Sequence, residues 1–137
     1  MTKIKCSYLG ELKCEATHLQ SGNKIKTDAP IDHCGKGESF SPTDLLATSL
    51  GTCLLTIMAI KARLDGWELE KICLNIDKIM TNNNNRKIKE LIIDIYVPEN
   101  LSEEKYKFLK NASKQCPVTR NLSDELNLKI SWFHKNN

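Results

Sequence analysis

The sequence predicts an α+β fold with antiparallel strand pairing and two helices. Short segments near both ends of the chain alternate polar and apolar residues, as half-buried strands do. A long apolar segment, Leu45–Ile60, has the spacing of a buried helix. Two further alternating segments flank a run of asparagines, which is typical of a hairpin. With 137 residues, the chain is expected to form a single domain, residues 1–137, around one core.

The N-terminal part of the chain predicts three strands and a loop. Lys3–Tyr8 and Glu11–His18 are expected to be two strands on either side of a turn at Gly10. A third strand is expected over residues 23–27. Residues 29–40 contain one proline and two glycines, and these residue types favour a loop.

The first helix is expected to begin at Ser41-Pro42-Thr43-Asp44. Serine can cap the first amides, proline suits the first helical position, and Asp44 completes a capping box. The helix should end near Gly66. A membrane span needs about 20 mostly apolar residues. Because the apolar stretch is shorter and contains threonine and serine, we expect a buried core helix and no membrane association.

The C-terminal half predicts a hairpin, a helix and a last strand. The hairpin strands are Leu69–Met80 and Lys87–Val97, and Leu126–Phe133 is the last strand. Ser102 is expected to cap a second helix that runs toward Cys116. Because proline follows Cys116, this cysteine either ends a helix or caps a new short helix.

The composition argues against several classes of function. The net charge is +3, and the lysines are scattered without a dense basic run, so nucleic-acid binding is not expected. The start has no continuous apolar run, so we expect no signal peptide and a cytoplasmic location. The six cysteines include no Cys-x-x-Cys pair and no zinc-finger spacing with histidine. We therefore expect reduced thiols, no metal site and no cofactor.

Two cysteines lie in contexts that could make a thiol reactive. Cys53 is on the apolar side of the first helix, where it could pack as a small hydrophobic residue or react. If Cys116 caps a helix, free amides would stabilise its thiolate, and Arg120 could add positive charge. Alternatively, Cys116 merely ends a helix and Arg120 faces solvent. The residues alone leave both alternatives open.

The segment SPTDLLATSLGTC, Ser41 to Cys53, resembles the first-cysteine motif of the OsmC/Ohr family. The segment CPVTR, Cys116 to Arg120, resembles its second-cysteine motif. Thr27-Asp28-Ala29-Pro30 and Gly35-Lys36-Gly37 are similar to an OsmC-like branch. The resemblance covers nearly the whole chain. It implies an intertwined homodimer in which curved antiparallel sheets surround two central helices, with each active site at the dimer interface.

The resemblance also implies a chemistry. Cys53 matches the peroxidatic cysteine, which attacks an organic hydroperoxide and becomes a sulfenic acid. Cys116 matches the resolving cysteine, which condenses with it to a disulfide. A dithiol reductant of the lipoyl type would restore both thiols. No metal, haem or flavin is required.

The sequence departs from the peroxidase pattern in its charged residues. Active Ohr-type enzymes use an arginine before the first motif, whereas this chain has none before Arg63. Lys24 could substitute, or Arg120 could approach; the other candidate substitutes are Lys26, His18 and His33. Asp44 stands where the family usually has glutamate. It precedes Cys53 by nine residues, about half a turn out of phase on a helix, so any contact with the thiol is expected to cross the dimer interface. Plain helix capping is the alternative role for Asp44.

Three functions follow from these features. The first is reduction of organic hydroperoxides. The second is action on another thiol or thioester substrate, which the missing arginine keeps open. The third is binding of a small hydrophobic ligand without catalysis.

Overall fold

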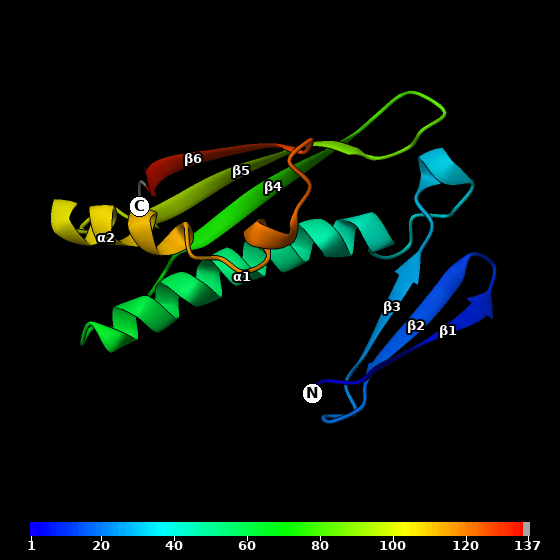
Figure 1. The fold of residues 1–137 in the computed structure, drawn as a ribbon, viewed down its shortest axis with the longest axis horizontal. Helices are drawn as coiled ribbons and strands as arrows, with labels where there is room; N and C mark the ends of the chain where they lie inside the picture. The colour runs from blue at the N-terminus through cyan, green and yellow to red at the C-terminus, as the bar shows by residue number, and fades with distance from the viewer. Residues whose placement is uncertain (136–137) are drawn as a thin grey trace. The chain divides into compact units, whose positions relative to one another are not determined.

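The structure is a computed structural model that describes residues 1–135 (Figure 1). It divides into two compact units, Met1–Leu46 and the remainder of the chain from Ala47. Three strands come first, and a long helix, a hairpin, a shorter helix and a last strand follow. The predicted α+β class and element order are therefore confirmed.

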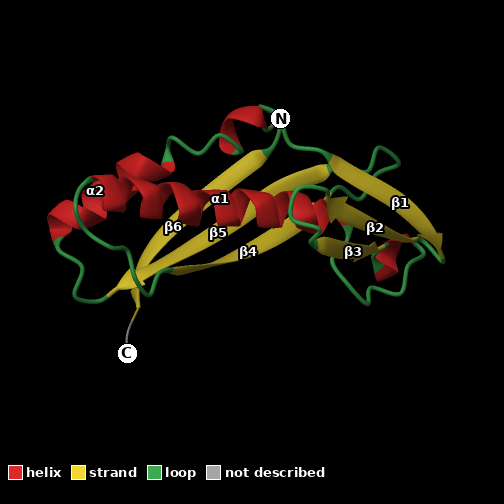
Figure 2. Ribbon diagram, turned by 90° about the horizontal axis from the view of Figure 1, so that it is seen from below, coloured by secondary structure: helices red, strands yellow, loops and turns green. Residues whose placement is uncertain are grey.

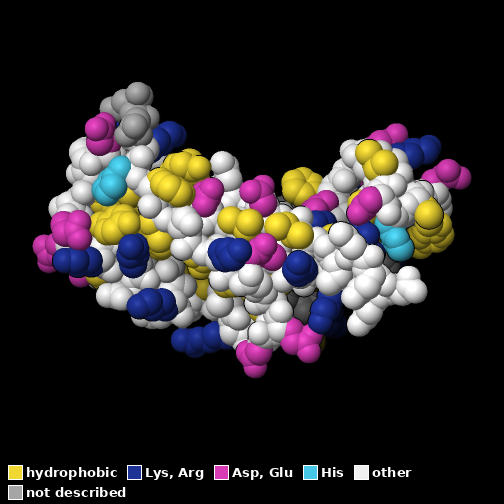
Figure 3. All heavy atoms as spheres, turned by 90° about the horizontal axis from the view of Figure 1, so that it is seen from above, with side chains coloured by type: hydrophobic (Ala, Val, Ile, Leu, Met, Phe, Trp, Pro, Cys, Tyr) yellow, Lys and Arg dark blue, Asp and Glu magenta, His cyan; other side chains and the backbone are white. Residues whose placement is uncertain are grey.

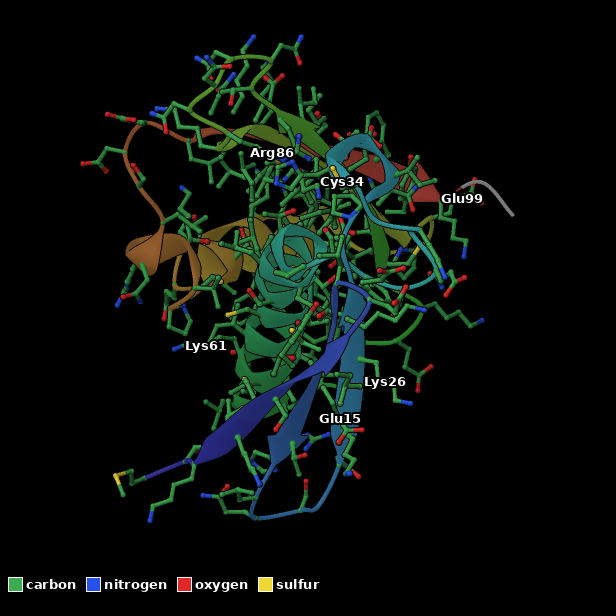
Figure 4. All side chains as sticks on the ribbon, turned by 90° about the vertical axis from the view of Figure 1, so that its right-hand side faces the viewer. Glu15, Lys26, Cys34, Lys61, Arg86 and Glu99 are labelled. Carbon is green, nitrogen blue, oxygen red and sulfur yellow. The ribbon has the colours of Figure 1, made fainter. Side chains whose placement is uncertain are left out.

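The first unit is built on a three-stranded antiparallel sheet. Its strands are β1 (Ile4–Gly10), β2 (Lys13–His18) and β3 (Lys24–Asp28), in the order β1-β2-β3. In this register Glu15 lies opposite Lys26, and Figure 4 labels both on neighbouring strands. The sheet matches the three predicted strands, although its first turn consists of Glu11 and Leu12 rather than Gly10 alone.

The predicted loop contains one short 3-10 helix, η1 (Ile31–His33), which ends at Cys34. Cys34 is exposed and has a left-handed backbone with φ of 65° (Figure 4). The buried Asp28 holds the far end of this loop, because its Oδ2 accepts a hydrogen bond from the Glu38 amide at 3.0 Å. The loop is thus tied to the sheet by a buried carboxylate side chain, whose loss of hydration this hydrogen bond partly offsets.

The long helix α1 (Pro42–Leu64) begins at the predicted capping box. The Ser41 amide donates to Asp44 Oδ2 at 2.7 Å, and the Asp44 amide donates to Ser41 Oγ at 3.1 Å. These two bonds satisfy amides that a helix start otherwise leaves unpaired. The helix ends near the predicted Gly66, whose φ of 84° suits glycine and turns the chain away.

The second unit contains a three-stranded sheet and the second helix. Its strands are β4 (Cys73–Met80), β5 (Ile88–Pro98) and β6 (Asn127–Lys135), in the order β4-β5-β6. The helix α2 (Glu103–Ser113) lies between β5 and β6 in the chain, and Ser102 caps it as predicted. In both ribbon views α1 runs along one face of this sheet (Figures 1 and 2).

The expectation of purely antiparallel pairing is wrong for the last strand. The pair β4–β5 is antiparallel, but β5–β6 is parallel, with Ile93 opposite Ile130. The physical reason is the connection: α2 carries the chain back along the sheet, so β6 runs in the same direction as β5. The sheet of the second unit is therefore mixed.

The core of the second unit lies between α1 and the middle strand β5. Three fully buried residues of α1, Leu50, Leu54 and Met58, form the helical side of this core. Every second residue of β5 points into it; these are Leu91, Ile93, Ile95 and Val97. Burial of each such side chain contributes about 1.5–3 kcal/mol. This packing holds the middle of α1, which carries Cys53, against the sheet.

One helix of the described chain, α1, is long and apolar enough to cross a membrane by length and composition. Its buried face packs on β5. On the surface seen in Figure 3, Lys and Arg side chains are interspersed with Asp and Glu side chains, and hydrophobic side chains form several patches. The side of α1 that faces the sheet is buried as predicted, whereas its other side, which includes Leu46 and Ile60, is exposed.

Candidate active site

The structure brings Cys53 and Cys116 together. Their Sγ atoms are 2.8 Å apart, although 63 positions separate them in the chain. Both are free thiols. A disulfide has its sulfurs about 2.05 Å apart, so a shift of less than one ångström would let this pair form one. Cys53 is half-buried, whereas Cys116 has no exposed surface.

Cys53 is positioned by α1. It lies midway along the helix, next to the fully buried Leu54, and packs against the edge of the core. Two residues earlier, Gly51 faces β4 so closely that a Cβ there would lie 2.6 Å from Ile76 Cδ1. The glycine thus lets the helix approach the sheet about half a turn before the thiol.

Cys116 is positioned by a tight turn after α2. Its amide donates to the Ser113 carbonyl at 3.2 Å, and a second 3-10 helix, η2 (Thr119–Asn121), follows. The Asn121 side chain donates to the Pro117 carbonyl at 2.8 Å and holds the turn. Cys116 therefore neither ends α2 nor caps a helix that begins at Pro117, because the chain first makes a separate turn.

Hydrogen bonds favour the ionised form of Cys116. Burial alone would raise the pKa of this thiol, but hydrogen bonds with Cys53, Thr119 and Val118 outweigh burial and lower its pKa below the ordinary value. The amides of Val118 and Thr119 contribute to this effect. Sulfur anions are commonly stabilised by amides in this way.

The environment of Cys53 has the opposite effect. Burial is the largest cause that raises the pKa of the Cys53 thiol, and the hydrogen bond with Cys116 raises it further. The Val118 amide offsets part of this rise. Within the described chain, these effects make Cys116 the more readily ionised of the two thiols.

The predicted supporting residues lie as follows. Arg120 is exposed on η2, and the groups that shift the pKa of the two thiols do not include it. Lys24 belongs to the sheet of the first unit, where its Nζ is 2.9 Å from Glu15 Oε1. This hydrogen bond lowers the pKa of the Glu15 carboxyl. Asp44 has its Oδ2 in the capping box, so capping is its observed role.

Two residues with an electrostatic effect on the site, Val118 and Thr119, were not predicted as functional. Both belong to the segment CPVTR, in which only the cysteine and the arginine carry an obvious chemical signal. The effect of Val118 comes from its backbone amide. Because every residue except proline has such an amide, the residue type gives no signal of this effect.

Among the described residues, no group of three or more His, Cys, Asp or Glu side chains could hold a metal ion.

The arrangement suits sulfur chemistry. The half-exposed thiol can meet a substrate, and the buried sulfur behind it can trap an oxidised product as a disulfide. Because the two sulfurs are already in contact, a sulfenic acid on one can condense with a thiolate on the other.

Comparisons with known proteins show the family of the chain. The sequence profile of the OsmC-like protein family matches residues 35–131. Among curated proteins, no sequence match is found. A solved structure from Psychrobacter arcticus 273-4, named as a candidate osmotic stress induced and detoxification response protein, is 41% identical with a TM-score of 0.89. The match covers 97% of this chain and 96% of that chain.

Two more distant structures share the fold. The organic hydroperoxide resistance protein OsmC of Legionella pneumophila is 16% identical, with a TM-score of 0.75 and 96% of each chain covered. The organic hydroperoxide resistance protein OhrB of Bacillus subtilis is also 16% identical, with a TM-score of 0.67. That match covers 97% of this chain and 98% of that chain. The chain belongs to the OsmC-like protein family and has its α+β fold.

Proposed function

We propose that the protein reduces organic hydroperoxides with Cys53 as the attacking thiol and Cys116 as the resolving thiol. The observation that carries this proposal is the 2.8 Å separation of the two sulfurs. The names of the Legionella and Bacillus relatives, which refer to organic hydroperoxide resistance, support the choice of substrate.

The proposed cycle has three steps. The Cys53 sulfur attacks one peroxide oxygen, the O–O bond breaks, and the alkoxide takes up a proton and leaves as an alcohol. Cys53 is then a sulfenic acid, and the Cys116 thiolate attacks its sulfur, which forms the disulfide and releases hydroxide. A dithiol of the lipoyl type reduces the disulfide by exchange and is itself oxidised to a disulfide. The cycle needs no metal or other cofactor.

Cys53 is the attacking thiol because of its exposure. A peroxide can reach the half-buried Cys53, whereas Cys116 is covered completely. The flanking side chains of α1 are apolar; Leu50 and Ile57 lie about one turn away on either side. Such a surface favours alkyl and aryl hydroperoxides over hydrogen peroxide.

A homodimer would complete the site. The sheet of the first unit carries exposed apolar residues on one face: Ile4 is 65% exposed, Tyr8 67% and Ile25 52%. The strand pairings place all three on the same side of the sheet. A second copy of the chain would cover this surface. We assign the dimer to the cytoplasm, where its cysteines would stay reduced.

The thiolate of Cys53 needs a positive partner, because burial raises its pKa. We propose Arg120, or Lys24 of a second protomer, for this role, with Asp44 as a carboxylate that could orient it. The substitutions Lys24→Met, Arg120→Met and Asp44→Asn test each candidate. The variant that loses peroxide turnover without losing stability identifies the partner.

The test of the proposed function is turnover of cumene hydroperoxide by the purified protein with dihydrolipoamide. We expect turnover that is abolished in Cys53→Ser and limited to a single oxidation in Cys116→Ser. The matched control is Cys73→Ser, because Cys73 is another free but exposed thiol; it should leave turnover unchanged.

If fully reduced wild-type protein consumes no hydroperoxide, the peroxidase proposal is wrong. The raised pKa of Cys53 and the lack of an arginine before Arg63 would then favour another thiol or thioester substrate. A ligand that raises the melting temperature without turnover would instead favour a binding role.

A further inference from the structure

The peptide unit between Pro117 and Val118 connects the turn after α2 to the thiol pair. Burial raises the pKa of both thiols, and the amide of this unit, that of Val118, acts in the opposite direction on each. The carbonyl of the same unit belongs to Pro117 and accepts the Asn121 side-chain amide at 2.8 Å. Because a trans peptide unit is planar, a bond that fixes its carbonyl also fixes the direction of its amide. Asn121 therefore holds this unit from its carbonyl side.

Asn121 closes the turn at two consecutive carbonyls. Its side chain takes the Pro117 carbonyl, and its backbone amide donates to the Val118 carbonyl at 3.0 Å. Proline has no amide, so the carbonyl is the only polar group of Pro117. Side-chain bonds of asparagine to nearby backbone groups are a common way of shaping a turn. The form of this turn thus depends on an amide side chain at position 121.

The other side of Cys116 is anchored on α2. The Cys116 amide donates to the Ser113 carbonyl at 3.2 Å, and the Gln115 amide donates to the Ala112 carbonyl at 3.0 Å. Ala112 and Ser113 are buried, whereas Asn121 is exposed. Cys116 is therefore held by a buried anchor on one side and by a surface side chain on the other. A single surface substitution can remove the second of these.

The position of Cys116 decides how fast the two sulfurs can join. They are 2.8 Å apart, and a disulfide needs about 2.05 Å. Groups held in a reacting geometry join much faster than free ones, and a misplacement of about 1 Å can cost about 100-fold in rate. Cys53 is half-buried, so a slow resolving step exposes its sulfenic acid to a second hydroperoxide. The sulfenate sulfur then attacks a peroxide oxygen, the O–O bond breaks, and a sulfinic acid and an alcohol result.

We propose that Asn121 is a positioning residue for the resolving thiol. By holding the Pro117 carbonyl, it keeps the Cys116 sulfur in contact with Cys53, so that disulfide formation outruns overoxidation. It acts through the backbone of the turn rather than on the reacting atoms. The inference deepens the proposed function and rests on it for the peroxide step, whereas the effect on disulfide formation does not depend on the oxidant.

The experiment follows disulfide formation with an aromatic disulfide, dithiobis(nitrobenzoate), in place of a peroxide. Reduced protein is mixed with one equivalent of this reagent. Attack by Cys53 releases one thionitrobenzoate and leaves a mixed disulfide, and attack by Cys116 on the Cys53 sulfur releases the second. Both rates are read on the plateau of their pH profiles, where ionisation no longer limits them. The background has serine at the other cysteines, which are Cys6, Cys14, Cys34 and Cys73.

Asn121→Ala should slow the second release by about three- to tenfold, as expected for the loss of one hydrogen bond, and change the first by less than about twofold. Because Asn121 is exposed and its backbone is not left-handed, alanine leaves neither a cavity nor strain. Asn121→Gln, which keeps an amide donor, should give a faster second release than Asn121→Ala. The matched control is Asn127→Ala, which removes a similar exposed side-chain bond, to Glu90 at 2.6 Å; it should leave both releases unchanged.

An unchanged second release in Asn121→Ala would overturn the inference. Equal slowing of both releases would overturn it too, because a general loss of structure rather than of position would then explain the effect. Should the background protein fold poorly, mass spectrometry of the mixed disulfide and of the Cys53–Cys116 disulfide gives the same two rates in protein that keeps all six cysteines.

Cumene hydroperoxide separates this inference from the proposed function. With this substrate, Asn121→Ala should accumulate more sulfinic acid on Cys53 per turnover than the wild-type protein. A slowed second release in a protein that consumes no hydroperoxide would remove the peroxidase function and keep the positioning role. Turnover together with a second release that ignores Asn121 would keep the function and remove the positioning role.

Discussion

The contact between Gly51 and β4 predicts that a larger side chain there destabilises the protein. A Cβ at this position would lie 2.6 Å from Ile76 Cδ1 and 3.0 Å from Leu74 Cδ1. Gly51→Val adds two further methyl groups to that Cβ. Because Gly51 itself is buried, the added groups have no open space, and α1 must move away from β4 or the two side chains must change rotamer.

The magnitude follows from two opposing effects. Overpacking of a core costs about 1–3 kcal/mol. Valine is a better helix former than glycine by about 0.3 kcal/mol, which offsets little of this cost. The net loss in the free energy of unfolding is therefore about 2 kcal/mol, equivalent to a fall of about 6–10 °C in Tm for a chain of this size.

Thermal unfolding followed by circular dichroism checks this value. The matched control is Thr56→Val, which introduces the same side chain at an exposed position of the same helix and should change stability by less than about 0.5 kcal/mol. If Gly51→Val is as stable as the wild-type protein, α1 does not approach β4 as closely as described. The reasoning about the position of Cys53 would then fail as well.

Three further predictions concern stability. Leu54→Ala should lower the free energy of unfolding by about 3 kcal/mol in urea titrations, because Leu54 is fully buried between α1 and β5; a loss below 1 kcal/mol, on the order of an exposed site, would contradict the described core. Ser102→Ala should cost about 1 kcal/mol in the same assay, because the serine side chain accepts the Lys105 amide at the start of α2; no loss would argue against this cap. Cys116→Ala should cost more at high pH than at low pH. The lowered folded pKa of Cys116 stabilises the protein above the unfolded thiol pKa of about 8.5, and this contribution disappears as the pH falls through the folded value. Equal costs at both ends of the pH range would contradict a stabilised thiolate.

Much of the fold could be predicted because local signals and tertiary packing agree. The capping box at Ser41 and Asp44 marked the start of α1, and Ser102 marked the start of α2. The alternation of polar and apolar residues predicted the hairpin, although β4 begins at Cys73, four residues later than expected. Residues 69–72 also alternate as a strand does, but Lys71 has a left-handed φ of 56°, which breaks the strand.

The direction of the last strand could not be predicted from its own residues. The alternation in β6 is the same whether the strand runs parallel or antiparallel to its neighbour. Only the crossing of α2 from one end of the sheet to the other decides that β6 is parallel to β5. This is a property of the connection rather than of the strand.

The site could be predicted only in part, for a different reason. The two motifs suggested that Cys53 and Cys116 act together, but no periodicity brings residues so far apart in the chain into contact. Their meeting depends on the packing of α1 and on the turn after α2. The roles of Val118 and Thr119 depend on a backbone amide and a buried hydroxyl, which have no signature in the sequence.

The measurement that tests the central claim most directly is a disulfide map after oxidation. Reduced protein is treated with an equimolar amount of cumene hydroperoxide, free thiols are blocked, and the peptides are analysed by mass spectrometry. We expect one disulfide that joins Cys53 to Cys116, with the other cysteines still thiols, and no such disulfide in Cys53→Ser. A different pairing, or Cys53 oxidised to a sulfinic acid while Cys116 remains free, would contradict the account.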